Sequence, residues 1–116
     1  MKDDLTALPA ELRRQSLSDR EIVLPYAEAL LAIDALKKSG YAVVVWEGWV
    51  LYPDGRVGHA SHEAQGTADH EWMGQWNAAE EFVRRTMERA QVYWSNSGRA
   101  GTLHFCLSTE PMAPRH

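Results

Sequence analysis

The chain has 116 residues, which is the size of one compact domain, so residues 1–116 are expected to share a single hydrophobic core. Its 16 acidic and 12 basic residues give a formal net charge of −4. This balance argues against direct binding to nucleic acid, because phosphate recognition needs a basic surface, and it suits a protein partner that is itself basic.

The sequence also limits the compartment and the chemistry. No run of about 18 apolar residues occurs, so we expect no membrane-spanning segment. The N-terminal residues lack the apolar core of a signal peptide, which favours the cytoplasm. The single cysteine, Cys106, has no partner for an internal disulfide or a cysteine-based metal site, and its apolar surroundings in the sequence are typical of a small core residue.

The first 18 residues are mostly polar. Pro9 to Gln15 has the pattern of a short helix that opens on a proline, but Leu12 is its only large apolar residue. We therefore expect residues 1–18 to fray, and residues 109–116, which carry two prolines, to do the same. Arg20 to Leu24 is compatible with a brief extended segment.

The segment from Pro25 to Ser39 predicts the first long helix. Proline suits the first helical position, and Gly40 suits the position that ends a helix in the left-handed conformation. Large apolar side chains recur at helical spacing in this segment, namely Tyr26, Leu30, Ile33 and Leu36.

The stretch from Gly40 to His59 predicts a hairpin that organises the whole domain. Ala42 to Trp46 is an unbroken apolar run rich in valine, which is typical of a central strand. Pro53-Asp54-Gly55 is a strong turn signal, because proline fixes φ, aspartate bonds its own backbone and glycine accepts a positive φ. Arg56 to His59 then returns as a shorter second strand.

A second helix is predicted to begin near Asn77, with Glu80 completing a variant capping box, and to stop at Asn96-Ser97-Gly98. The last strand, Gly101 to Ser108, alternates apolar and polar residues and should be half-buried. Its apolar positions are Leu103, Phe105 and Leu107, and its polar positions are Thr102, His104, Cys106 and Ser108. Together these elements predict an α+β fold with two layers, in which two main helices pack on one face of a small antiparallel sheet.

The segment between the hairpin and the second helix collects potential metal ligands. His59, His62 and His70 supply imidazoles, and carboxylates lie beside them. These groups are the ligands that zinc prefers, but the HExxH motif is absent and no helix signal covers His59 to Glu63. A small metal-binding protein or a metal-dependent enzyme that uses these three histidines is therefore the alternative hypothesis.

Trp46 and Trp49 lie three residues apart on one predicted strand, so they should point to opposite faces unless Gly48 marks a bulge. One indole would then pack under the helices, and the other would stand on the open face of the sheet. An exposed indole surrounded by acids would form a hot spot for a protein partner. The candidate contact residues are Trp46, Glu47, Trp49, Glu63, Asp69 and Glu71. The competing possibility is that the N-terminal segment or a second copy in a homodimer covers this face.

An enzymatic function finds little support in the sequence. Glu47 lies between two tryptophans, where apolar surroundings could raise the pKa of a general acid, but no second carboxylate can be placed opposite it. Ser61-His62-Glu63 contains triad-type residues, but triad members meet through the fold rather than through adjacency in sequence. We therefore predict a protein that is not an enzyme and needs no cofactor.

One part of the chain resembles a known class of proteins. The helix that ends in Ala35-Leu36-Lys37-Lys38-Ser39-Gly40, followed by Trp46-Glu47-Gly48-Trp49 and by Tyr52-Pro53-Asp54-Gly55-Arg56-Val57-Gly58-His59, is similar to small bacterial immunity proteins. These proteins are the cytoplasmic antidotes of polymorphic toxin and contact-dependent growth inhibition systems. The resemblance covers Leu24 to His62, about a third of the chain, and the second half from Glu63 onward matches nothing similar.

The resemblance implies a function but no site. Such antidotes bind one cognate toxin, often a nuclease, and block it; they differ widely in fold and share no catalytic residue that could be carried over. Many of these toxins are basic, which agrees with the net charge of −4.

Overall fold

The computed structural model describes residues 5–60, 66–67 and 76–112, together with their side chains except those of residues 66–67. The elements in chain order are a 3₁₀ helix η1 (Leu5–Ala7), α1 (Ala10–Gln15), β1 (Ile22–Pro25), α2 (Tyr26–Lys38), β2 (Tyr41–Leu51), β3 (Val57–His59), β4 (Gly66–Thr67), α3 (Trp76–Ser97) and β5 (Thr102–Pro111). Helices and an antiparallel sheet form two layers, which confirms the predicted α+β fold.

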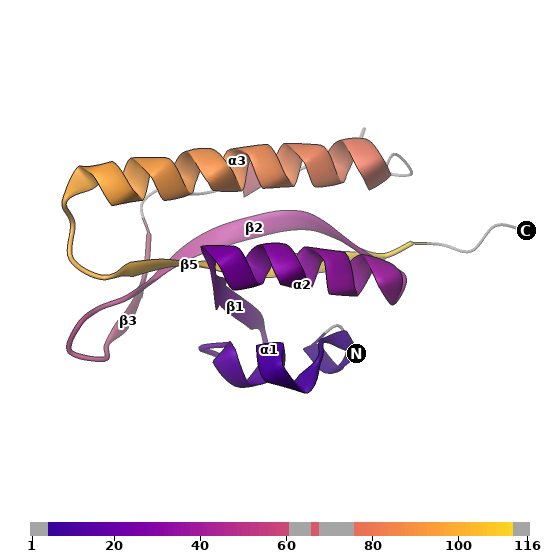
Figure 1. Ribbon diagram of the computed structural model, residues 1–116, viewed down its shortest axis with the longest axis horizontal. Helices are drawn as coiled ribbons and strands as arrows, with labels where there is room; N and C mark the ends of the chain where they lie inside the picture. Colours follow the sequence, from indigo (N-terminus) through magenta and orange to yellow (C-terminus); the bar gives the residue numbers. More distant parts are fainter. Residues whose placement is uncertain (1–4, 61–65, 68–75, 113–116) are drawn as a thin grey trace, which may run out of the picture.

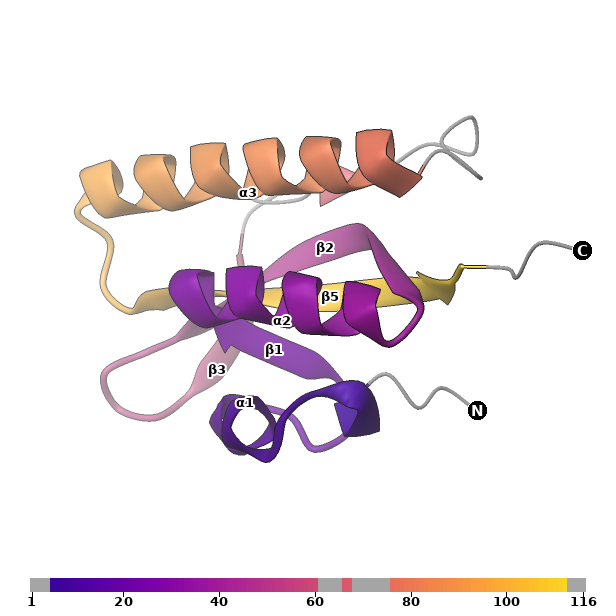
Figure 2. The same ribbon diagram turned by 45° about the vertical axis from the view of Figure 1, so that its right-hand side comes forward.

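The strands do not pair in chain order. The sheet has the order β1-β5-β2-β3, and β4 pairs with β2. All pairings are antiparallel. The C-terminal strand therefore inserts between β1 and β2 and becomes central. In Figure 1, α2 crosses in front of β5, α3 runs above β2, and α1 lies below β1. The turned view of Figure 2 shows β5 behind α2 and its partner strand β1 below α2.

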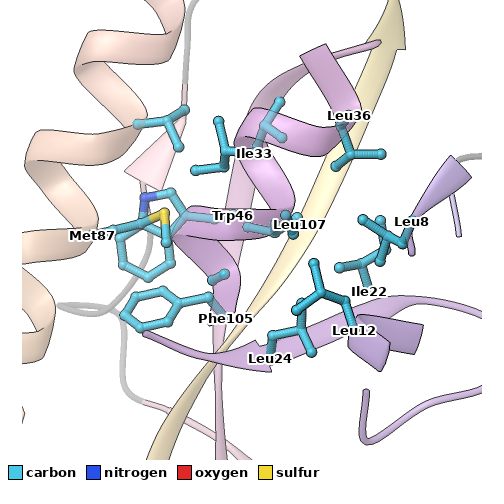
Figure 3. Packing of buried hydrophobic residues seen from close by; sticks show 14 of the residues in the cluster. Leu8, Leu12, Ile22, Leu24, Ile33, Leu36, Trp46, Met87, Phe105 and Leu107 are labelled. Atoms are coloured by element: carbon cyan, nitrogen blue, oxygen red, sulfur yellow. The ribbon is translucent and has the colours of Figure 1, made fainter. Parts of the chain in front are cut away.

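The core lies between the sheet and the helices (Figure 3). Trp46 of β2 is only 1% exposed, and the edge of its ring meets Phe105 of β5 with centroids 5.1 Å apart. Its indole Nε1–H donates to Thr86 Oγ1 on α3 at 2.9 Å. Helix residues Ile33 and Met87 pack around it. The predicted split of the two tryptophans is therefore right, and Trp46 is the one that lies under the helices.

The second and third helices follow their predicted patterns closely. α2 begins after Pro25 and ends at Lys38, and Gly40 follows with φ of 90°, as the sequence predicts. α3 ends at Ser97, and Gly98 follows with φ of 73°. The predicted capping box is wrong, because α3 begins at Trp76 and Asn77 lies inside its first turn.

Asn77 and Glu80 instead serve a contact between the two helices. The Asn77 Oδ1 accepts a hydrogen bond from Lys37 Nζ of α2 at 3.4 Å. The Glu80 carboxylate pairs with the same lysine at 3.2 Å and with Arg84 at 2.8 Å. Both polar residues of the expected cap are therefore used across the helix pair.

The N-terminal segment does not fray where the structure describes it. Leu8 and Leu12 are buried in the same cluster as Ile22, Leu24 and Leu36 (Figure 3). The chain after α1 is also tied to the sheet, because Ser16 Oγ accepts from Val23 N at 3.0 Å and Leu17 N donates to Val23 O at 3.0 Å. The expected fraying of residues 1–18 is thus wrong for residues 5–18, since two leucines anchor the segment beside β1.

The C-terminal strand is longer and more buried than its pattern predicts. β5 extends to Pro111, and Thr109 is buried, so the expected fraying of residues 109–116 is wrong for 109–111. His104, a polar position of the predicted half-buried strand, is only 5% exposed, and Cys106 is 4% exposed, as expected for a small core residue. β5 is a central strand, with β1 on one side and β2 on the other.

None of the helices within the described ranges has both the length and the apolar character needed to cross a lipid bilayer.

Candidate functional site

The candidate site is the sheet face opposite α2 and α3, which we call the open face. β2 and β5 pair with a register shift at Val44, and side chains alternate regularly beyond it. Trp46, paired with Leu107, faces the core, so Glu47 and Trp49 face the other way. The bulge lies before both tryptophans and not at Gly48, which is why they stay on opposite faces.

Three carboxylates share the open face. Glu47 pairs with Cys106 on β5, and Glu21 approaches the same cysteine from the β1 side, where Cys106 Sγ donates to Glu21 Oε2 at 3.7 Å. Glu110 pairs with Ala42 further along β5. Glu21 and Glu47 lie on opposite sides of β5, and β1 and β2 are about 10 Å apart because neighbouring strands are separated by about 4.8 Å.

The described strand positions of this face hold no lysine or arginine. Register and alternation place the following residues there: Val23, Pro25, Ala42, Val45, Glu47, Trp49, Leu51, Val57, His59, Thr102, His104, Cys106, Ser108 and Glu110. Glu21 comes just before β1 and joins this face through its contact with Cys106. The face is therefore acidic, and it would attract a basic surface.

Glu47, Trp49 and His59 form a compact cluster on this face. The indole Nε1–H of Trp49 donates to Glu47 Oε1 at 3.4 Å. The rings of His59 and Trp49 pack edge to face, with their centroids 5.2 Å apart. His59 Nδ1 lies 3.9 Å from Glu47 Oε2, and the two side chains are 67% and 44% exposed. Trp49 itself is half-buried. The cluster thus presents an aromatic ring, a carboxylate and an imidazole to solvent.

Buried groups support this cluster from the middle of the sheet. His104 pairs with Trp49 across β5 and β2, and its Nδ1–H donates to Thr102 O at 3.1 Å. Cys106 beside it is buried and bonded to Glu21, as the sequence predicts for a small core residue. Two buried residues of β5, His104 and Cys106, are therefore the cross-strand neighbours of Trp49 and Glu47.

Between residues 5 and 15, the N-terminal segment lies on the helix side of the sheet and not on the open face. Leu8 and Leu12 pack with core-facing side chains of β1 and α2, so α1 extends the helix layer. One of the two alternatives raised by the sequence, a face covered by the N-terminal segment, is therefore wrong for residues 5–15.

The predicted contact residues lie in different parts of the molecule. Glu47 and Trp49 lie together on the open face. Trp46 does not belong to a binding surface, because its side chain is buried and its indole N–H already donates to Thr86. Glu63, Asp69 and Glu71 lie outside the described residues. Glu21 and Glu110, which the sequence reasoning missed, join the face only through their register with β5 and β2.

The alternative metal site depends mostly on residues outside the described part. His62 and His70 lie there, and His59 contacts Trp49 and Glu47. Among residues 5–60, 66–67 and 76–112, no group of three or more His, Cys, Asp or Glu side chains is placed to hold a metal ion.

Comparison with protein-family models, with curated proteins and with solved structures finds no match to this chain.

Proposed function

We propose that the protein is a toxin-neutralising immunity protein that binds one basic cognate toxin through the open face of its sheet. The observation that carries the proposal is the cluster of Glu47, Trp49 and His59 on a face with three carboxylates and no lysine or arginine at its described strand positions. The proposed place of action is the cytoplasm of the cell that makes the toxin.

The physical argument concerns what such a face can recognise. Tryptophan is enriched among the residues that dominate binding energy, because a large ring buries much apolar area and still offers one polar N–H group. Carboxylates around the ring pair with lysine or arginine of the partner and accelerate encounter through long-range attraction. A toxin that acts on nucleic acid needs basic groups at its own site, and an acidic antidote would cover them.

Capture and neutralisation together test the proposal. The protein, immobilised on a resin, is exposed to lysate and secreted fractions of the organism that carries its gene, and bound proteins are eluted with high salt and identified by mass spectrometry. We expect one basic protein that stops growth when expressed alone and is harmless when this protein is co-expressed.

Variants locate the face in the same assay. Replacing Trp49 with alanine together with Glu47→Lys should abolish capture and protection. Tyr93→Ala, which removes an aromatic side chain exposed on α3, is the matched control and should leave both intact. An empty column, or capture of a protein that is not toxic, would contradict the proposal.

A further inference from the structure

A second feature lies at the end of the sheet, where the hairpin turn approaches the C-terminal end of α3. A cavity of about 300 Å³ opens there between three parts of the chain. Its lining consists of Val50, Tyr52, His59, Ala60, Trp94, Arg99 and Ala100. This volume lies at the lower end of the range in which proteins hold small molecules.

Glycines shape two walls of the cavity. A side chain at Gly58 would come within 3.2 Å of the Tyr52 ring, so the absence of a Cβ allows the ring to lie against β3. Gly98 and Gly101 have φ of 73° and 99°, and they turn the chain sharply between α3 and β5. The indole N–H of Trp94 donates to Gly101 O at 3.1 Å, which fastens that turn to the helix.

Arg99 is the unusual member of the lining. Its guanidinium carbon lies 5.6 Å from the Trp94 ring centroid and 5.8 Å from the Tyr93 ring centroid. Within the described residues it has no carboxylate partner, and its side chain donates no hydrogen bond. The two aromatic rings therefore hold a cation in place while its N–H groups stay available.

Arg56 differs from Arg99 in having an acidic partner. Arg56 also lies over an aromatic ring, that of Tyr52, at 5.0 Å from the centroid. Its guanidinium is already paired with Asp54 at 2.8 Å, and Arg56 does not line the cavity. Of the two arginines at this end of the molecule, only Arg99 lines the cavity and is without an acidic partner among the described residues.

We propose that this cavity binds a small planar molecule that carries a carboxylate or phosphate group. The rings of Tyr52 and Trp94, with the aliphatic Val50 and the two alanines, provide apolar and aromatic surface for a flat ring. Arg99 provides the planar fork of donors that matches two oxygens of an anionic group. The cavity and the open face share only His59, and the argument for the ligand uses Arg99, Trp94 and Tyr52, so this inference does not depend on the proposed function.

Nuclear magnetic resonance titration tests the proposal on the full chain. Benzoate and phenyl phosphate are the probes, and benzamide is the uncharged counterpart. We expect saturable shifts of the Trp94 indole N–H, of the Arg99 Nε–H and of the Ala60 and Ala100 amides with both anions. Benzamide should bind at least about tenfold more weakly, because it lacks the charge-assisted contact.

Two arginine variants complete the test. Arg99→Gln should weaken benzoate binding at least about tenfold, whereas the matched variant Arg56→Gln should change it less than about twofold. The Trp46 indole resonance reports whether each variant keeps its core. If Arg99→Gln does not fold, the comparison of benzoate with benzamide on the unaltered protein decides. Shifts that do not saturate, equal binding of benzamide, or unchanged binding by a folded Arg99→Gln variant would overturn the proposal.

Discussion

The indole N–H of Trp49 donates to the carboxylate of Glu47, two residues earlier on the same strand and 3.4 Å away. Both side chains stand on the open face, and the His59 ring meets the indole from the neighbouring strand. The contact orients the aromatic ring and the charge relative to each other before any partner arrives. Since less side-chain freedom is then lost on binding, the pair is suited to act as an anchor.

Thr86→Val is expected to destabilise the protein although it preserves the shape of the side chain. Thr86 Oγ1 accepts from the buried indole N–H of Trp46 at 2.9 Å, and valine would leave that donor without a partner. A buried unsatisfied donor costs about 1–3 kcal/mol. Urea unfolding followed by circular dichroism measures the free energy of unfolding. Thr102→Val, at an exposed strand position, should change it by less than about 0.5 kcal/mol, and equal effects of the two variants would refute the role of Thr86.

Arg84→Ala is expected to loosen the contact between α2 and α3. Arg84 bonds Glu80 on its own helix at 2.8 Å and Asp34 on α2 at 2.6 Å. These pairs are partly solvated, so their loss should cost about 1 kcal/mol at low salt and less at about 1 M salt, where charges are screened. The control is Arg89→Ala, an exposed arginine on the same helix. A cost that does not depend on salt would show that Arg84 stabilises by packing instead.

Gly101→Ala is expected to cost more stability than Gly98→Ala. Both glycines have positive φ, so alanine at either position meets backbone strain of about 1 kcal/mol. At Gly101 the new Cβ would also lie 2.7 Å from Val50 Cγ1 and 3.0 Å from Leu51 O, whereas nothing lies within 4 Å at Gly98. We expect a total of about 3 kcal/mol for Gly101→Ala. Thermal unfolding of both variants measures the two losses of stability. A larger loss for Gly98→Ala than for Gly101→Ala would contradict this prediction.

Tyr26 should make stability fall at alkaline pH. Burial, and to a smaller extent the nearby Glu88 carboxylate, raise the pKa of its hydroxyl above the usual 10.0, although Arg84 lowers it. Because the folded-state pKa is the higher one, the contribution to stability is complete below the unfolded pKa and is lost as pH rises through the folded pKa. Tyr26→Phe should therefore flatten the decline of unfolding free energy above about pH 10.

Equal slopes for Tyr26→Phe and the unaltered protein between about pH 9 and 11 would argue against a perturbed Tyr26.

Local patterns predict much of this fold. α2, the hairpin turn and the end of α3 follow from helical spacing, from Pro53-Asp54-Gly55 and from Gly98. The opposite faces of Trp46 and Trp49 follow from strand alternation alone. These features depend on residues close together in the sequence, where propensity and periodicity act directly.

Long-range pairing is what the patterns miss. β5 inserts between β1 and β2, and nothing in its own segment indicates this pairing or the burial of His104. α1 has only six residues, fewer than two helical turns, and Leu8 precedes it, so the anchoring role of Leu8 and Leu12 does not show as a helical pattern in the sequence. Glu21 and Glu110 join Glu47 only because β5 brings β1 and β2 together.

The central claim, that the open face binds a basic toxin, is tested most directly by association kinetics with the captured partner. Glu21→Lys combined with Glu47→Lys reverses two carboxylates of the face, and Glu81→Lys combined with Glu88→Lys reverses two exposed acids of α3 as a matched control. We predict that the open-face reversal lowers the association rate constant at least about tenfold at low salt, while the α3 reversal lowers it less than about threefold. Equal rate constants for the two double variants, both of them folded, would contradict the claim.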